Sequence, residues 1–458
     1  MELNKYMFRE YDIRGVWRKD INEEVSYLIG RAFGSKLKRL GKVETLVGYD
    51  NRYSSPIIEE NVVKGIRECG VNVVRLGLVT TPMYYYGWDL LNIKCGIMIT
   101  ASHNPKDDNG FKFSYNGIHN AYGKSSLELY EMIINNDFEN GEMGSVRDVN
   151  IREDYIKMIT KNINLGNHRI KVVYDCGNGT TAIVADDIFN TFKDKIDLVP
   201  LFNTSDSTFP NHHPDPAVEE NLTLLKEKIK ETNADVGIAF DGDGDRVGVI
   251  TGTGEFLSID KYMIIIWRDL IHKNVDKKTF YDVKCSLALK EELDKLGVEN
   301  KFFRTGNSYT KAESVEGNYP FSGELSGHVF FRDKFPGYDD GIYAGLRLIE
   351  ILTNEGKTIE ELLSGISIYL STPEIKIATP DEIKFQVIDK VKKYSENKNY
   401  NILLVDGVKV LFNDGTALVR ASNTGPNITT RFEAKTEERL QEIKSEFLDL
   451  IEEIKNNL

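Results

Sequence analysis

The chain has 458 residues, which exceeds what one compact core supports and predicts three or four domains. Its composition is ordinary for a globular protein, with 41% hydrophobic and 28% charged residues. The formal net charge of -13 argues against nucleic-acid and anionic-membrane partners, because both are polyanions. An anionic ligand must therefore be bound by a local cluster of positive side chains.

Neither export nor membrane insertion is indicated. The first residues, Met1–Lys5, lack the apolar core of a signal peptide, and apolar runs such as Met263–Trp267 are far too short to span a bilayer. The cysteines are scattered without C-x-x-C spacing, and we expect them to stay reduced. They are Cys69, Cys95, Cys176 and Cys285. These features predict a cytoplasmic protein.

Short apolar strands alternate with amphipathic helices through the first three quarters of the chain. The first block has predicted strands at Thr45–Tyr49, Val71–Leu76 and Gly96–Thr100 and a predicted helix at Ile57–Cys69. The layout returns in two later blocks. Their elements are strand Ile170–Tyr174, helix Thr181–Phe192, strands Asp197–Leu201, Asp235–Phe240 and Thr279–Val283, helix Leu287–Leu296 and strand Asn300–Arg304. Each block is typical of a small α/β domain, and the three are similar without a strict sequence period.

The last block follows a different pattern. Its predicted strands are Ile375–Ile377, Ile402–Val405, Val408–Phe412, Ala417–Val419 and Thr429–Ala434. Gly407 and the pair Asp414-Gly415 are typical of hairpin turns, and an amphipathic helix at Thr436–Ile454 closes the chain. The sequence therefore predicts an α/β protein with three similar mixed α/β domains and a C-terminal α+β domain. We place these domains at residues 1–145, 146–253, 254–370 and 371–458.

Three carboxylates alternate with two glycines directly after the apolar run Val236–Phe240, in Asp241-Gly242-Asp243-Gly244-Asp245. Carboxylates this close repel one another, and a hard cation among them relieves the repulsion. An EF-hand is excluded, because Arg246 and Gly252 stand where that loop needs Gly and Glu. The segment predicts a Mg²⁺ site rather than a solvated acidic turn. By itself it does not distinguish a hydrolase, a kinase and a structural cation site.

A serine follows the predicted strand Gly96–Thr100, in Ala101-Ser102-His103-Asn104-Pro105. Ligands bind at this end of the strands in open α/β sheets, although a serine there can also simply cap a turn or a helix. The G-x-S-x-G elbow of α/β-hydrolases is absent. Beside a metal held by the acidic loop, Ser102 could carry a phosphoryl group whose charge the metal offsets. Reversible phosphoryl exchange then needs only the seryl phosphate, the metal and a sugar hydroxyl.

Two further segments carry groups suited to phosphate and sugar. The run Arg420–Gly425 offers a guanidinium, two hydroxyls and an amide, which suit a phosphate as well as a polar surface turn. In Gly323–His328, Glu324 and Ser326 lie two apart and point the same way on an extended loop, which suits adjacent sugar hydroxyls. His328 suits a phosphate contact or a proton transfer.

Two basic residues are candidates for the same pocket. Arg14 lies in a predicted loop, and Lys112 follows the serine by ten residues and could serve as a proton donor or acceptor. A solvated surface side chain is the alternative for both. The run Gly117–Ser125 is no P-loop, because five residues separate its glycines where four are required. Adjacent His212 and His213 diverge in most backbones, so we expect a loop near the entrance there instead of a metal site.

In this order, the motifs resemble the α-D-phosphohexomutase family, in its phosphomannomutase/phosphoglucomutase branch, over essentially the whole chain. The matching segments are Tyr11–Gly15, Gly48–Pro56, Thr100–Pro105, Asp241–Arg246, Asp282–Lys284, Gly323–His328 and Arg420–Pro426. The resemblance implies four domains around a central active-site cleft, with one motif from each domain lining it.

The resemblance also implies roles for individual residues. The phosphorylated serine is Ser102, whose phosphate joins Asp241, Asp243 and Asp245 as metal ligands. The resemblance assigns catalytic roles to Ser102, Arg14, His103, Lys112, Arg246 and His328. Sugar and phosphate binding falls on Lys284, Gly306, Glu324, Ser326, Arg420, Ser422, Asn423 and Thr424. Two positions depart from the pattern: Gly425 replaces the usual Glu, and Asn307 replaces a frequent His, which leaves His328 as the histidine to test.

The activity implied by the resemblance is the Mg²⁺-dependent interconversion of hexose 1-phosphate and hexose 6-phosphate through a phosphoserine and a hexose 1,6-bisphosphate. Thr100 and Leu325 are more similar to the mannose/glucose branch, so phosphoglucosamine mutase is the nearest alternative. A non-catalytic sugar-phosphate-binding relative is the other alternative, and the intact serine, aspartates and Lys112 oppose it. We expect small phosphosugars as ligands and a monomer or homodimer.

Overall fold

The computed structural model of the chain describes residues 3–117, 120–422 and 425–458. It divides into two compact units. Unit 1 comprises Met1–Ser258, Asn307–Phe321 and Ser326–Leu362, and unit 2 comprises Ile259–Gly306, Ser322–Leu325 and Leu363–Leu458. Within the described ranges, no helix is both long enough and apolar enough to cross a membrane. The four cysteines are free and buried.

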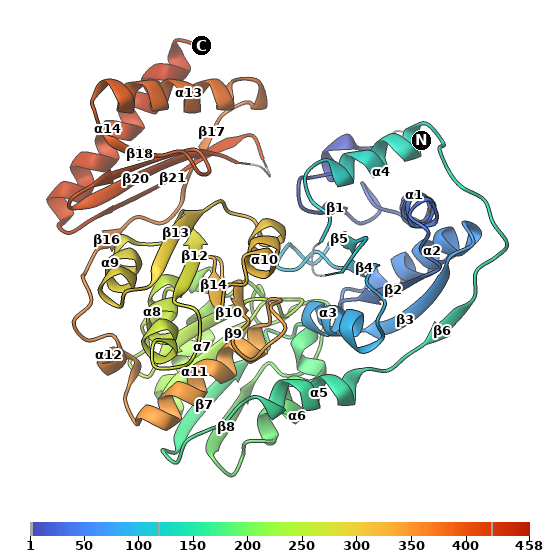
Figure 1. The fold of residues 1–458 in the computed structure, drawn as a ribbon, viewed down its shortest axis with the longest axis horizontal. Helices are drawn as coiled ribbons and strands as arrows, with labels where there is room; N and C mark the ends of the chain where they lie inside the picture. Colours follow the sequence, from blue (N-terminus) through green and yellow to red (C-terminus); the bar gives the residue numbers. More distant parts are fainter. Residues whose placement is uncertain (1–2, 118–119, 423–424) are drawn as a thin grey trace. The chain divides into compact units, whose positions relative to one another are not determined.

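The first sheet of unit 1 has six strands in the order β1-β5-β4-β2-β3-β6 (Figure 1). The strands are β1 Ile13–Val16, β2 Glu44–Tyr49, β3 Asn72–Leu78, β4 Gly96–Ile99, β5 Asp108–Ser114 and β6 Val146–Asp148. The helices of this part are η1 Lys5–Met7, α1 Glu23–Arg39, α2 Ser55–Glu68, α3 Thr81–Leu90 and α4 Lys124–Ile134. Strand β2 is parallel to β3 and β4, whereas β5 runs antiparallel to β4 and β1. The connection from β4 to β5 therefore leaves the sheet at the carboxyl end of β4, and it carries Ser102.

The second sheet of unit 1 has the order β11-β10-β9-β7-β8. Its strands are β7 Ile170–Asp175, β8 Ile196–Leu201, β9 Val236–Phe240, β10 Val247–Thr251 and β11 Phe256–Leu257. The helices are α5 Arg152–Lys161, η2 Thr180–Ile183, α6 Ala185–Asn190, η3 Glu219–Leu222, α7 Thr223–Thr232, α10 Asn307–Glu316, α11 Gly341–Glu355 and α12 Ile359–Leu362. The short strand β15 Val329–Phe331 also belongs to the residues of unit 1 but is not part of this sheet.

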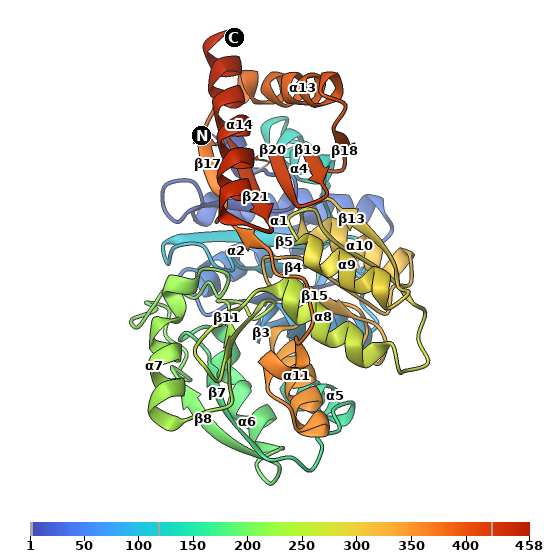
Figure 2. The same ribbon diagram turned by 90° about the vertical axis from the view of Figure 1, so that its left-hand side faces the viewer.

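Strand β9 is buried along its whole length because helices cover both of its faces. Gly237 lies against Leu225 and Ile229 of α7, and Ile238 on the other face lies against Gly345 of α11. Figure 2 shows α7 and α11 on opposite sides of this sheet. Burial on both faces explains why the run Val236–Phe240 is continuously apolar up to the first carboxylate.

Unit 2 combines an α/β part with the C-terminal sheet. The α/β part has α8 Ile259–Leu270, β12 Lys278–Asp282, α9 Leu287–Lys295, β13 Glu299–Phe303 and β14 Phe321–Gly323, with β12 parallel to β13 and β14. The C-terminal sheet has the order β16-β21-β20-β19-β18, and β17 also pairs with β21. Its elements are β16 Leu370–Ser371, β17 Ile375–Ala378, α13 Asp381–Asn397, β18 Asn401–Leu403, β19 Val408–Phe412, β20 Gly415–Ala421, β21 Asn427–Ala434 and α14 Glu437–Asn456.

Helices α13 and α14 pack on one face of the C-terminal sheet (Figure 1). Alternate residues of β19 and β20, such as Val408 and Val410 or Ala417 and Val419, point into the same core as Phe447 of α14. This alternation places one set of side chains of each strand in the core beneath the helices. All seven residues of β20 are nonetheless buried, so its other face is covered as well.

Two predicted elements differ from the structure. The helix predicted at Thr181–Phe192 is split into η2 and α6, because the backbone at Val184 leaves the helical region with φ at -134°. The predicted turn Asp414-Gly415 lies one residue earlier: Gly415 already pairs with Phe412 across the hairpin and with Ala434 of β21.

Candidate active site

The three aspartates of the acidic loop lie in the connection between β9 and β10, where Phe240 pairs with Val247. Asp241 and Asp243 are fully buried and Asp245 is 1% exposed. One oxygen from each carboxylate lies within 4.8 Å of the others. The glycines between them are needed for space and for backbone conformation: a Cβ at Gly242 would lie 2.6 Å from the Ser102 carbonyl oxygen, and Gly244 has a φ of +84°.

Lys112 of β5 offsets part of this buried negative charge. Its Nζ lies 2.8 Å from Asp243 Oδ2 and 2.6 Å from Asp245 Oδ2, and the lysine itself is 7% exposed. Burial alone would lower the pKa of Lys112, but the two carboxylates hold it well above its ordinary value. The same contact keeps the pKa of Asp243 low against the effect of burial, whereas burial and the neighbouring carboxylates raise the pKa of Asp241.

Some of the carboxylate oxygens accept hydrogen bonds from hydroxyl and backbone amide groups. Thr81 Oγ1 donates to Asp243 Oδ2 at 2.6 Å, and the backbone N–H groups of Gly244 and Arg246 donate to Asp241 Oδ1 at 3.0 and 3.1 Å. Asp243 Oδ1 and Asp245 Oδ1 are buried and have no hydrogen-bond partner. Buried carboxylate oxygens without donors are costly unless a cation binds them, so this oxygen set fits a hard divalent ion.

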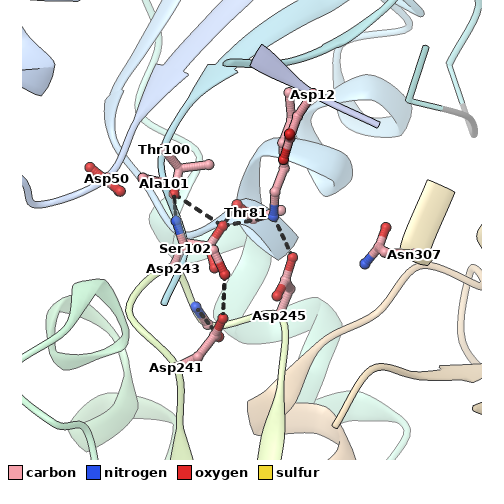
Figure 3. A network of polar contacts seen from close by, with 12 residues as sticks. Asp12, Asp50, Thr81, Thr100, Ala101, Ser102, Asp241, Asp243, Asp245 and Asn307 are labelled. Atoms are coloured by element: carbon pink, nitrogen blue, oxygen red, sulfur yellow. Dashed lines mark hydrogen bonds and ion pairs between the residues drawn. The ribbon is translucent and has the colours of Figure 1, made fainter. Parts of the chain in front are cut away.

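The Ser102 side chain is directed at the aspartate cluster (Figure 3). Its Oγ donates to Asp241 Oδ2 at 2.7 Å, and its backbone N–H donates to Thr100 Oγ1 at 2.8 Å. The serine is 1% exposed and has a φ of +52°, in the left-handed region that residues with a Cβ seldom adopt. A reactive hydroxyl is thus held against a potential metal site by a constrained backbone.

Two predicted catalytic residues flank the serine. His103 Nδ1 lies 3.2 Å from Ser102 Oγ, and burial together with the charges of Arg246 and Arg14 holds the pKa of His103 well below its usual range. The lowered pKa favours the neutral form of the His103 ring. Arg14 of β1 donates to the Ala101 carbonyl oxygen at 3.2 Å and to Asn104 Oδ1 at 2.6 Å, which ties it to the serine loop.

Arg246 and His328 form a second group beside the acidic loop. Arg246 Nε donates to His328 Nε2 at 2.9 Å, and His328 Nδ1 lies 2.7 Å from Asp339 Oδ2 and 3.5 Å from Asp245 Oδ1. Asn307 Nδ2 lies 2.9 Å from His328 Nδ1 and also donates to Asp339. If Arg246 donates to Nε2, the proton of a neutral ring must sit on Nδ1, facing Asp339. With the proton on Nδ1, the Asn307 amide cannot donate to that atom, and its hydrogen bond goes to Asp339 instead.

The predicted sugar and phosphate residues Lys284, Gly306, Glu324, Arg420 and Ser422 lie in unit 2. Lys284 Nζ lies 3.0 Å from Glu374 Oε1 and 3.4 Å from Asp282 Oδ2. The Gly306 N–H donates to Glu324 Oε1 at 3.2 Å, and Arg420 Nη2 lies 2.8 Å from Asp406 Oδ2.

A hydrogen-bond chain links two of these groups. Thr305 donates from Oγ1 to Asp282 and from its backbone N–H to Asp406, so that the Lys284 and Arg420 neighbourhoods share one network. Lys384 Nζ donates to the Ser422 carbonyl oxygen at 2.7 Å. Lys284 and Arg420 are thereby linked through two carboxylates, the buried Asp282 and the half-buried Asp406.

The structure therefore brings the predicted residues together in two sets. Unit 1 holds Ser102, His103, Arg14, Lys112, Arg246, His328 and the three aspartates, and it also holds Ser326. Unit 2 holds the remaining described residues. Asn423 and Thr424 lie outside the described residues.

Several contact residues were missed at the sequence level. Thr81, Thr100 and Asp339 touch the candidate catalytic groups, and Asp406 and Lys384 touch the phosphate-loop residues. Thr100 did stand in a matching segment, without a site role assigned to it. The pair Asp339-Asp340 in front of the apolar helix α11 suits a helix cap and was a second sequence signal.

Comparisons with known proteins cover nearly the whole chain. Family models described as phosphoglucomutase/phosphomannomutase match residues 5–140 (alpha/beta/alpha domain I), 153–254 (domain II), 258–369 (domain III) and 374–450 (C-terminal domain). A phosphomannomutase/phosphoglucomutase from Pseudomonas putida is 40% identical over 96% of this chain and 94% of its own length. A protein named "Probable phosphoglucosamine mutase" from Methanothermobacter thermautotrophicus is 34% identical over 95% of this chain and 96% of its own length.

A solved structure agrees with these matches. The crystal structure of a phosphoglucomutase/phosphomannomutase family protein from Burkholderia thailandensis has a TM-score of 0.91 and 36% identity, and it covers 98% of both chains. Four α/β-type domains with mixed sheets and a buried serine–carboxylate site define a phosphohexomutase, an isomerase of the intramolecular phosphotransferase kind. The chain belongs to the phosphoglucomutase/phosphomannomutase family.

Proposed function

We propose that this phosphohexomutase interconverts the 1- and 6-phosphates of glucose and mannose, with Ser102 as the phosphoryl carrier. The observation that carries the proposal is the 2.7 Å contact of Ser102 Oγ with Asp241, inside a carboxylate set that retains unpartnered oxygens. Asp241, Asp243 and Asp245 would hold Mg²⁺ together with the serine phosphate. When bound there, Mg²⁺ supplies positive charge that offsets the charge of the phosphoryl group.

In the proposed reaction, the bond between phosphorus and Ser102 Oγ breaks while a bond forms to a hydroxyl of the hexose monophosphate. The Lys112 ammonium donates a proton to Ser102 Oγ as that oxygen leaves, and the resulting amine takes up the proton of the attacking hydroxyl, which restores the ammonium beside the carboxylates. The product of this half-reaction is a hexose 1,6-bisphosphate. Its other phosphoryl group then returns to Ser102, and the same compound primes the free enzyme.

Arg14, His103, Arg246 and His328 orient the serine loop and the transferred group in this scheme. Glu324, Ser326 and Gly306 would bind the sugar, and Lys284, Arg420, Ser422, Asn423 and Thr424 would bind the phosphate that stays in place. We further propose domain limits at 1–145, 146–253, 254–370 and 371–458. A cytoplasmic monomer or homodimer without a nucleic-acid partner is the assembly we expect.

The test is whether Ser102 carries phosphate that the substrate can discharge. Purified protein should show an intact-mass shift of about 80 Da after treatment with glucose 1,6-bisphosphate, and hexose monophosphate should remove it. Ser102→Ala should lack the shift and lose turnover by several orders of magnitude. Turnover by Ser102→Ala at the wild-type rate would overturn the proposal.

Sugar preference needs a separate measurement, because the Methanothermobacter relative is named as a probable phosphoglucosamine mutase. We expect kcat/KM for mannose and glucose 1-phosphates to exceed that for glucosamine 1-phosphate. A pocket residue discriminates by roughly 10- to 200-fold, so the preference should be of that order. The reverse order would assign the protein to phosphoglucosamine mutases.

A further inference from the structure

Arg52 is a buried charged side chain beside the serine loop that the reaction scheme does not use. It lies just before α2 and is 1% exposed. Its guanidinium N–H groups donate to the backbone oxygens of Ser102 (2.8 Å), Asn104 (2.7 Å), Pro105 (2.5 Å) and Asp108 (2.9 Å). Asp50, also 1% exposed, lies 3.2 Å from Arg52 Nε and accepts the Arg52 backbone N–H.

The loop that Arg52 binds contains a strained residue. Ser102 has a φ of +52°, and a residue with a Cβ in that region persists only where its surroundings hold it there. Two contacts hold the backbone of Ser102 from opposite sides: Thr100 Oγ1 accepts its N–H, and Arg52 Nη2 binds its carbonyl oxygen. With this backbone, Ser102 Oγ lies 2.7 Å from Asp241.

We propose that Arg52 is a positioning residue for phosphoryl transfer: it holds the backbone from Ser102 to Asp108 so that the Ser102 hydroxyl stays directed at the aspartate cluster. The inference deepens the proposed function and rests on Ser102 as the phosphoryl carrier. Arg52 does not touch the reacting atoms in this scheme. It acts through four carbonyl groups, which turn toward the guanidinium and fix the path of the loop.

The geometry requires arginine specifically. A guanidinium presents five N–H donors in a rigid plane, and here they serve four carbonyl oxygens and one carboxylate. A lysine ammonium keeps the charge but has three donors on a flexible stem, so it cannot bind all of these oxygens. Arg52→Lys therefore separates positioning of the loop from simple charge balance with Asp50.

The experiment measures the rate at which Ser102 takes up a phosphoryl group from glucose 1,6-bisphosphate, followed by quenched-flow intact mass. Displacement of a reacting group by about 1 Å costs about 100-fold, so Arg52→Lys should slow uptake by between 10- and 100-fold. KM for the hexose phosphate should change by less than about 3-fold, because Arg52 does not contact the residues proposed to bind the sugar. Uptake by Arg52→Lys at the wild-type rate would overturn the proposal.

Arg347→Lys is the matched control. Arg347 of α11 is also 1% exposed, and within the described ranges its polar partners are Asp333 at 2.8 Å, Glu350 and Tyr343, none of which belongs to the serine loop. Its replacement should lower Tm and leave the uptake rate of the folded enzyme unchanged. An equal slowing in Arg347→Lys would mean that general destabilisation explains the Arg52 effect, and the proposal would fail.

A further variant covers the case in which Arg52→Lys does not fold. Asp50→Asn is isosteric and removes the charge that orients the guanidinium, so uptake should slow by about 3- to 10-fold. Wild-type uptake by Asp50→Asn, with Arg52→Lys unfolded, would count against positioning. Failure of the wild-type protein itself to phosphorylate Ser102 would instead refute the proposed function, so the two outcomes are distinguishable.

Discussion

Buried carboxylates occur both inside and outside the candidate active site. Near Ser102, each buried carboxylate has a cation, a hydroxyl or an amide beside it. Glu59 of α2, which is 7% exposed, also has a buried oxygen without a hydrogen-bond partner, Oε1, but it lies outside the candidate site. Burial raises the pKa of Glu59 to about 7, although Arg75 acts in the opposite direction. Such a carboxylate makes the folded state sensitive to pH.

The pH dependence follows from the direction of this shift. Because the pKa of Glu59 is higher in the folded state than its ordinary 4.5, its contribution to stability is complete below about pH 4.5 and is lost as the pH rises through about 7. Glu59→Gln should therefore be more stable than the wild type at pH 8, by roughly 2–3 kcal/mol in urea unfolding, and nearly equal to it at low pH. Glu60→Gln, at the exposed neighbouring position, is the control. Equal effects of the two variants would contradict the prediction.

At the scale of elements, the start of helix α11 links stability to the candidate site. Asp340 is the N-cap of α11 and accepts the Tyr343 N–H at 2.9 Å and the Tyr155 hydroxyl at 2.7 Å. The residue before it, Asp339, contacts His328. Fraying of the first turn of α11 would therefore move the carboxylate that orients the His328 ring.

Asp340→Ala should lower both stability and kcat. Loss of an N-cap and of a buried hydrogen bond costs about 1–2 kcal/mol, and Asp340→Asn, which keeps the cap, should restore most of both. Thr436→Ala removes the N-cap of α14, which accepts the Arg439 N–H at 3.2 Å in unit 2. That control should lose about 1 kcal/mol with unchanged kcat. Chemical unfolding measures the stability of the three variants, and steady-state kinetics measures their kcat. A wild-type kcat in Asp340→Ala would contradict the proposed link between the start of α11 and the candidate site.

On the scale of the whole molecule, the candidate catalytic and binding residues divide between the two units. The serine and the aspartates belong to unit 1, whereas Lys284 and Arg420 belong to unit 2. A metal bound by the aspartates should therefore act first on unit 1. A ligand that binds the folded state and not the unfolded state also raises the free energy of unfolding, by about 2.7 kcal/mol when the ligand is at 100 times its Kd.

Adding Mg²⁺ to chelator-treated protein should raise Tm and restore activity. In hydrogen exchange, protection should increase in peptides covering 96–114 and 236–251 and stay unchanged in 401–421. Asp243→Asn should lose the response, because it removes a carboxylate from the oxygen set. Activity that persists in chelator, or protection spread evenly over the chain, would argue against a metal held by these residues.

Local chemistry determined much of what the sequence could predict. The apolar run Val236–Phe240, followed by alternating aspartates and glycines, indicated both the buried strand and the metal-type oxygen cluster, because charge repulsion and glycine conformations act over a few residues. Short strands, hairpin-turn residues and the closing amphipathic helix likewise indicated the C-terminal α+β part, in which α13 and α14 pack on the sheet. The four-domain architecture and the family were confirmed by the comparisons.

Only the tertiary structure decided which distant groups meet. Arg52 lies fifty residues from the serine whose carbonyl it binds, and His328 lies eighty-two residues from Arg246. The residues next to Arg52 in the sequence do not distinguish it from a surface arginine. In the same way, the residues next to Gly415 do not show whether this glycine begins a strand or completes a turn. Those outcomes depend on the packing of segments far apart in the chain. The sequence alone thus determined the kinds of groups available for phosphoryl transfer, and the fold decided how they are held, because buried polar groups are stable only where tertiary partners satisfy them.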